Sequence, residues 1–142
     1  MDEAYKKAVA LLAVRDYTAS QLQARLRRFP KVDAAEAITA LVRQGALDDR
    51  RFAENYVRRR PEFSRARLAA DLERRGVAET IVEEVLEQGK ERLSLSDVLN
   101  ATMERSQLRA PLAPRDAQRL FRSLKRLGYG DDEIQEELER FL

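Results

Sequence analysis

Cysteine and histidine are both absent from this sequence of 142 residues. Their absence removes the commonest general base, the soft metal ligands and the thiol nucleophile that enzymes use. It also excludes a disulfide framework and is compatible with a reducing cytoplasm. We therefore expect a protein that is not an enzyme, with no catalytic residue, no metal and no cofactor.

Glycine and proline are scarce, with five and four residues. The glycines are scattered rather than gathered in a phosphate-binding loop, and they stand at positions 45, 76, 89, 128 and 130. Leucine, alanine, arginine and glutamate dominate, and all four favour helices. No apolar run approaches the roughly 20 residues that span a membrane, and the N-terminal segment carries acids that are untypical of a signal peptide. These features predict an all-α, cytoplasmic protein that does not associate with membranes.

A site made only of carboxylates is the catalytic alternative that the composition leaves open. Its candidates are the acidic runs Asp48–Asp49 and Asp131–Glu133. Both runs stand where a helix is expected to start, and acids at such positions cap backbone N–H groups and favour the helix dipole. We prefer this structural interpretation of the acids.

The sequence repeats itself at intervals of 46 and 52 residues. Leucines four residues apart recur, followed in two cases by a glycine that suits the left-handed position after a helix. The matched residues are Leu22 and Leu26, then Leu68, Leu72 and Gly76, then Leu120, Leu124 and Gly128. Two segments, Thr18–Gln21 and Asp33–Glu36, also match the capping-box pattern that starts a helix.

Each repeat predicts two helices around a short turn, and a further amphipathic helix precedes each pair. The preceding helices are expected at about Glu3–Val14, Asp49–Arg60 and Leu95–Leu108. The sequence thus predicts three tandem three-helix modules, at residues 1–46, 47–89 and 90–142. Because each module has few apolar residues of its own, we expect them to form an elongated, curved helical-repeat array.

Arginine accounts for 22 of the 27 basic residues, although the net charge is only +2. Arginines seven residues apart project from the same side of a helix, away from its leucines. They stand at matching positions in the repeats, and the set is Arg28, Arg51, Arg58, Arg67, Arg74, Arg119 and Arg126. They predict a basic stripe that could follow a phosphate backbone or an acidic protein surface. The alternative is a solvated face whose arginines pair with the chain's own acids, at about 0–1 kcal/mol for each exposed pair.

One segment resembles the signature of the RecX family of recombinase regulators, G-x-L-D-D-x-R-F-A-x-x-Y. Every defined position is matched, by Gly45, Leu47, Asp48, Asp49, Arg51, Phe52, Ala53 and Tyr56. In this signature we expect Asp48 to cap a helix, Asp49 to favour its dipole, and Phe52 and Tyr56 to fill a core. Arg51 has no core role, which favours binding. The segment Pro61–Arg65 departs from the family, which often has a glycine and a basic residue there.

The resemblance implies a role in homologous recombination, DNA repair and the SOS response. It implies a negative regulator that binds in the groove of the RecA–single-stranded-DNA filament and inhibits ATP hydrolysis, strand exchange and filament extension. The implied partners are RecA and its filament, with weak direct contact to DNA, and we expect a monomer. A stand-alone DNA-binding helical protein and a helical scaffold for some other protein are the alternatives.

Overall fold

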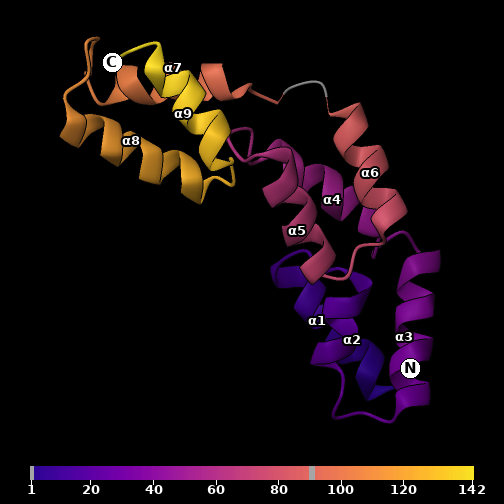
Figure 1. The fold of residues 1–142 in the computed structure, drawn as a ribbon. Helices are drawn as coiled ribbons and strands as arrows, with labels where there is room; N and C mark the ends of the chain where they lie inside the picture. The colour runs from indigo at the N-terminus through magenta and orange to yellow at the C-terminus, as the bar shows by residue number, and fades with distance from the viewer. Residues whose placement is uncertain (1, 90–91) are drawn as a thin grey trace.

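All regular secondary structure in the computed structural model is helical (Figure 1). The structure describes residues 2–89 and 92–142, and within them there are nine helices and no strand. In chain order they are α1 (Glu3–Val14), α2 (Ala19–Arg25), α3 (Lys31–Arg43), α4 (Asp49–Arg58), α5 (Arg65–Arg74), α6 (Glu79–Gln88), α7 (Leu95–Arg105), α8 (Pro114–Arg126) and α9 (Asp131–Glu139). The prediction of an all-α fold is confirmed. None of these helices is both long enough and apolar enough to span a lipid bilayer.

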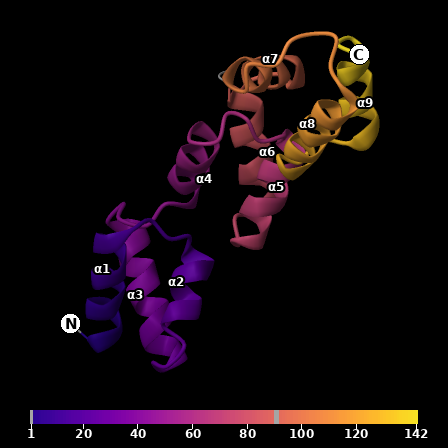
Figure 2. The same ribbon diagram turned by 90° about the vertical axis from the view of Figure 1, so that its left-hand side faces the viewer.

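The buried side chains form three separate clusters, one for each set of three consecutive helices. The first runs from Ala8 to Leu47, the second from Ala53 to Leu86 and the third from Val98 to Leu138. We call α1–α3, α4–α6 and α7–α9 the first, second and third units. In Figures 1 and 2 the units follow one another along a bent, elongated molecule, as expected for a helical-repeat array.

The exact unit boundaries remain a prediction. Leu47 is buried in the first cluster, although the sequence places it at the start of the second module. The predicted start of the third module, at residue 90, lies outside the described residues.

Local chemistry sets most of the helix ends. The backbone N–H of Gln21 donates to Oγ1 of Thr18, and that of Thr18 donates to Oε1 of Gln21, both at 3.1 Å, which confirms the first predicted capping box. The second prediction is wrong, because α3 begins at Lys31 and Asp33 lies inside its first turn. Pro30 precedes α3 with a φ of −55°, and this constrained backbone starts the helix before the acid is reached.

Two helices end earlier than the sequence predicts. Helix α4 stops at Arg58, because the residue before Pro61 is disfavoured in helical conformation. Helix α7 stops at Arg105, and Gln107 takes a positive φ of 57°. The N–H of Leu108 then donates back to the carbonyl of Met103 at 2.9 Å, which closes the helix end.

The middle helices of the three units, α2, α5 and α8, meet end to end. At the start of α2, the hydroxyl of Thr18 donates to the carbonyl of Arg75, which ends α5, at 2.5 Å. At the start of α5, the backbone N–H of Ser64 donates to the carbonyl of Leu127, which ends α8, at 2.9 Å. Each joint therefore places the positive start of one helix dipole against the negative end of another.

A glycine with positive φ makes each of these joints possible. Gly76 and Gly128 follow α5 and α8 with φ values of +87° and +100°. A Cβ atom at Gly76 would lie less than 3.0 Å from the side chain of Ser20, and one at Gly128 equally close to that of Arg67. The glycines are thus needed both for the turn and for the close approach of the neighbouring unit.

Replacing the joint glycines should cost more stability than replacing a glycine that only turns the chain. Gly45→Ala is the matched control, because its φ is +74° but nothing lies within 4 Å of an added Cβ atom. We expect Gly45→Ala to cost about 1–2 kcal/mol from backbone strain. Gly76→Ala and Gly128→Ala should each cost a further 1–3 kcal/mol, roughly, from overpacking. Denaturant unfolding measures the losses, and equal losses at all three positions would contradict the role of the joints.

Candidate functional site

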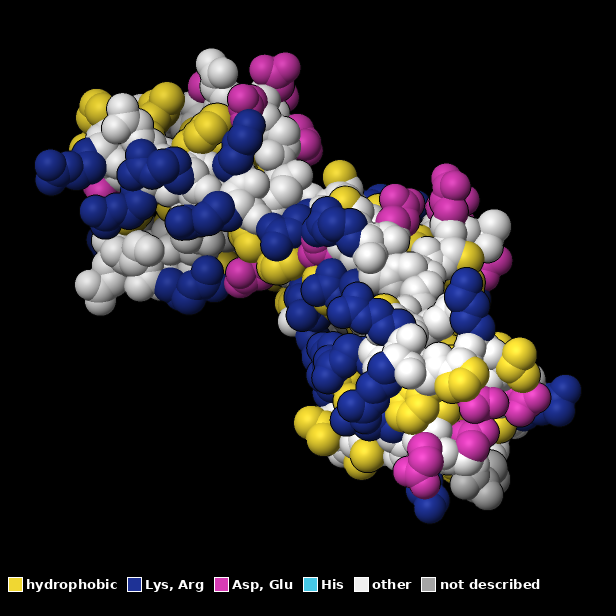
Figure 3. All heavy atoms as spheres, turned by 90° about the horizontal axis from the view of Figure 1, so that it is seen from below, with side chains coloured by type: hydrophobic (Ala, Val, Ile, Leu, Met, Phe, Trp, Pro, Cys, Tyr) yellow, Lys and Arg dark blue, Asp and Glu magenta, His cyan; other side chains and the backbone are white. Residues whose placement is uncertain are grey.

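Basic side chains gather in a band across one face of the molecule. Figure 3 shows this band running from the third unit through the middle of the array to the first unit, with acidic side chains mainly towards its edges. Of the seven arginines that the sequence predicts for binding, Arg67 is half-buried and the other six are exposed. Their contacts divide them into arginines that support the fold and arginines that remain available.

Arg67 and Arg74 support the fold through a buried acid. The side chain of Asp71 is only 2% exposed, and both guanidinium groups form ion pairs with it. Arg67 also donates to the carbonyl of Arg126 at the joint with the third unit, and it lies 4.6 Å from the ring centre of Phe63. The sequence predicts that these two arginines project outward for binding, but their contacts show that they also stabilise the fold.

Asp71 is a structural centre that the sequence prediction missed. The hydroxyl of Tyr56 donates to its Oδ2 at 2.8 Å, and Nε of Arg67 donates to the same oxygen at 3.2 Å. Burial raises the pKa of Asp71, but the bond from Tyr56 and the charges of Arg67 and Arg74 outweigh it, so the pKa lies below its usual value. Burial and the bond to Asp71 together raise the pKa of Tyr56. The sequence contains a signal for these ion pairs, because Asp71 stands four residues after Arg67 and three before Arg74, and such residues are neighbours on a helix.

The sequence predicts a binding role for Arg51, but its side chain also supports the fold. Its Nη1 donates to the carbonyl of Gly45 at 2.9 Å and its Nη2 to that of Ala46 at 3.2 Å, so it holds the loop that leads into α4. Arg58 donates to Oδ1 of Asn55 on its own helix.

The remaining predicted arginines have few contacts. The guanidinium of Arg28 lies 5.1 Å from the ring centre of Phe29. That of Arg126 donates to Ser123 at 3.4 Å. Within the described part of the chain, Arg119 forms no ion pair and no side-chain hydrogen bond. Arg28, Arg119 and Arg126 are thus exposed and have few contacts inside the chain.

The other signature residues shape the second unit and its contact with the first. Asp48 caps α4 by accepting from the N–H of Arg51 at 3.1 Å, as predicted. Asp49 lies in the first turn of α4, as predicted. It also accepts from the N–H of Ala19 at 2.9 Å, and so caps a helix of the neighbouring unit. Ala53 and Tyr56 are buried in the second cluster, whereas Phe52 is half-buried at its edge.

A cleft of about 550 Å³ lies between the first and second units, and we call it the inter-unit cleft. Four arginines line it, and none of them belongs to the predicted stripe. They are Arg15, Arg59, Arg60 and Arg75. The sequence could not bring these residues together, because the cleft exists only once two units are joined.

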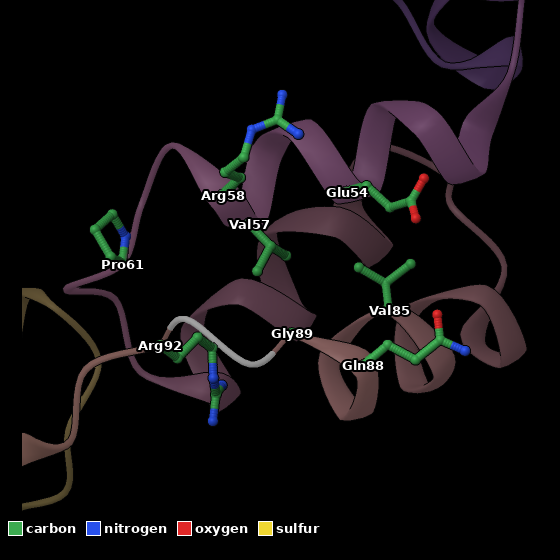
Figure 4. Close-up of a pocket in the computed structure, with 8 residues that line it drawn as sticks. All are labelled: Glu54, Val57, Arg58, Pro61, Val85, Gln88, Gly89 and Arg92. Atoms are coloured by element: carbon green, nitrogen blue, oxygen red, sulfur yellow. The ribbon is translucent and has the colours of Figure 1, made fainter.

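A second cleft of about 480 Å³ lies between α4 and α6. Figure 4 shows Val57 and Val85 facing it, with the side chain of Arg58 directed away from them. Glu54 is its only lining acid among the described residues.

Asp71→Asn should destabilise the protein by about 1.5–3 kcal/mol at pH 7, because charge-assisted hydrogen bonds from Tyr56 and two arginines are lost. The folded-state pKa of Asp71 lies below its unfolded value, so its contribution is present above pH 3.8 and is lost as the pH falls through the folded pKa. The stability difference from wild type should therefore narrow in strong acid. Denaturant titrations from pH 7 to pH 2 measure it, with exposed Asp132→Asn as the control. A difference that does not change with pH would contradict an ionised Asp71.

The known proteins that this chain resembles all belong to one family. The model of the second three-helix domain of RecX matches residues 48–86. The regulatory protein RecX of Halorhodospira halophila is 33% identical over 131 residues, covering 89% of this chain and 81% of that protein. That of Treponema pallidum is 34% identical over 148 residues, covering 97% and 76%. The match with RecX of Trichlorobacter lovleyi, at 37% identity, covers 61% of this chain and 59% of that protein.

The fold agrees with these matches. The crystal structure of RecX from Lactobacillus salivarius superposes with a TM-score of 0.70 at 19% sequence identity, covering 98% of this chain and 94% of that one. The similarity in sequence extends over most of two relatives and includes the segment from Asp48 to Tyr56. The chain belongs to the RecX family of regulatory proteins.

Proposed function

We propose that this chain is a non-enzymatic negative regulator of the RecA recombinase. It binds in the groove of the RecA–single-stranded-DNA filament and inhibits ATP hydrolysis, strand exchange and filament extension. The observation that carries the proposal is the elongated array of similar units, with basic side chains along one face. The localisation that follows is the cytoplasm, where such filaments form.

A repeating target suits a repeating ligand. A filament presents the same protein surface and the same phosphates at regular intervals, and units joined in series can contact several of these positions at once. Once the first unit is bound, the others bind at a high effective concentration, so weak contacts add to a firm attachment. A protein attached to several protomers would slow the changes in filament geometry that accompany turnover.

The exposed arginines suit both surfaces of such a filament. A guanidinium group binds carboxylate or phosphate through two parallel hydrogen bonds. Arg28 lies in the first unit, Arg119 and Arg126 lie on α8 of the third unit, and all three have few contacts within the chain. They are therefore better candidates for binding than Arg67 and Arg74, which are already paired with Asp71.

The second candidate is a protein that binds DNA without RecA, and the inter-unit cleft with its four arginines is the observation that favours it. A net charge of only +2 argues against tight binding to bare DNA, since charge neutralisation supplies most of non-specific affinity. We expect the affinity for bare DNA to be modest and to fall steeply with salt.

Substoichiometric amounts of the protein should lower the rate of ATP hydrolysis by RecA on single-stranded DNA and should slow strand exchange. Hydrolysis is followed by a coupled spectrophotometric assay. Unchanged turnover and unchanged strand exchange would rule out the proposed function.

The triple variant Arg28→Ala, Arg119→Ala, Arg126→Ala should inhibit RecA about tenfold less effectively, because exposed charge-assisted contacts are removed. Circular dichroism should show unchanged helicity. The matched control is Arg27→Ala, Lys31→Ala, Arg43→Ala, which removes three exposed basic side chains of the first unit. Equal inhibition by the triple variant and the control would mean that the three arginines only face solvent.

A further inference from the structure

The inter-unit cleft has a concentration of positive charge that is not matched by negative charge in its lining. Its lining includes four arginines, and Asp16 is the only acid among the residues that line it. Within the described part of the chain none of the four arginines forms an ion pair, whereas Arg67 and Arg74, close by, share Asp71. Grouping unpaired like charges in one cleft costs electrostatic energy, so an anionic ligand would relieve a repulsion that is already present.

Two of the four guanidinium groups are held in place in advance. Arg60 lies 3.6 Å and Arg75 4.8 Å from the ring centre of Tyr56. Nη1 of Arg60 donates to the carbonyl of Tyr56 at 3.2 Å, and Nη1 of Arg75 donates to the carbonyl of Asp71 at 3.0 Å. A guanidinium has five N–H donors, so each group keeps several for a ligand without having to be ordered on binding.

The other two arginines stand at the edge of the cleft and are exposed. Arg15 lies 4.1 Å from the ring centre of Tyr17, which it shares with Arg25 at 5.8 Å. The nearby guanidinium of Arg15, ahead of that of Arg25, lowers the pKa of Tyr17 against the opposite effect of burial, and Nη1 of Arg25 donates to its hydroxyl at 3.5 Å. The positive potential thus extends from the cleft to the turn between α1 and α2.

An aromatic surface lies beside the charges. Phe52 is half-buried, lines the cleft and is stacked with Tyr56, with ring centres 6.3 Å apart and an angle of 18° between the planes. Sites for single-stranded nucleic acid combine a basic groove for the backbone with exposed aromatic faces for the bases. An acidic peptide would need the arginines but would have no use for this ring.

The amide side chains and the size of the cleft agree with a nucleotide. Gln21 and Asn55 also line the cleft. Their amide oxygens accept from Thr18 and Arg58, but their NH2 groups can still donate to base edges. The volume of about 550 Å³ lies within the range of roughly 300–1,000 Å³ for sites that hold small organic ligands.

We propose that the inter-unit cleft binds the phosphodiester backbone of single-stranded nucleic acid, with Arg15, Arg59, Arg60 and Arg75 on the phosphates and Phe52 against a base. This inference rests on the proposed function, because the filament supplies the strand. It assigns the contact with DNA to a joint between two units rather than to the outer face of a helix.

The test uses the full chain and a fluorescein-labelled oligothymidylate, with binding followed by anisotropy at several salt concentrations. Arg15→Ala, Arg59→Ala should weaken binding about tenfold or more and lower the slope of log affinity against log salt by about 0.7 for each phosphate that is no longer neutralised. Lys31→Ala, Arg43→Ala is the control of equal charge, because both residues are exposed on α3 and outside the cleft. The control should keep the affinity and slope of the wild type.

Chemical modification of wild-type protein tests the site without any variant. Phenylglyoxal modifies accessible arginines, and mass spectrometry locates them. Oligothymidylate should protect Arg15 and Arg59 but not Arg43. Equal modification of Arg59 with and without the oligonucleotide, or wild-type affinity of the cleft variant, overturns the inference. Protection by hexaglutamate but not by oligothymidylate overturns it in favour of an acidic peptide.

Parallel measurement of ATP hydrolysis by RecA separates this inference from the proposed function. If wild-type protein inhibits RecA while the cleft arginines stay unprotected, the cleft inference fails and the proposed function stands. If oligothymidylate protects the cleft but RecA turnover is unaffected, the proposed function fails and the cleft assignment stands.

Discussion

The close contact between the start of one middle helix and the glycine that ends the next is the constraint on which the array depends. Without a side chain at Gly76 or Gly128, the backbone of one unit can approach the next closely enough for a hydroxyl or an N–H group to reach a helix-end carbonyl. The same contact satisfies polar groups that would otherwise be left unpaired at both helix ends. Three small cores thus become one molecule through a few hydrogen bonds at helix ends.

The proposed binding cleft depends on the same joints. Asp49 of the second unit caps α2 of the first, and this contact holds the two walls of the inter-unit cleft together. Arg67 plays a related part at the other joint, where it links Asp71 of the second unit to the end of α8. Basic residues in this chain therefore fall into two groups. Some are fixed within the fold, and others are exposed with few contacts inside the chain.

The sequence predicted the helices well but not the contacts between units. Leucines four residues apart identify a buried helix face by themselves, so the three cores could be foreseen. The hydrogen bond between Asp49 and Ala19 could not be foreseen, because Ala19 is 30 residues away and belongs to another unit. For the same reason, nothing in the sequence pattern brought Arg15 together with Arg59 and Arg75. The position of Asp71 between two arginines was visible, but its burial depends on Tyr56 from a different helix.

The position of each joint on the axis of the middle helices has a mechanical consequence. A small change at such a contact would turn one unit relative to the next, because the hydrogen bonds there join cores that are otherwise separate. A slight rotation at Gly76 would be magnified into a large sweep of the third unit, while the three cores stayed intact. The curvature of the array would change in this way without any of its helices unfolding.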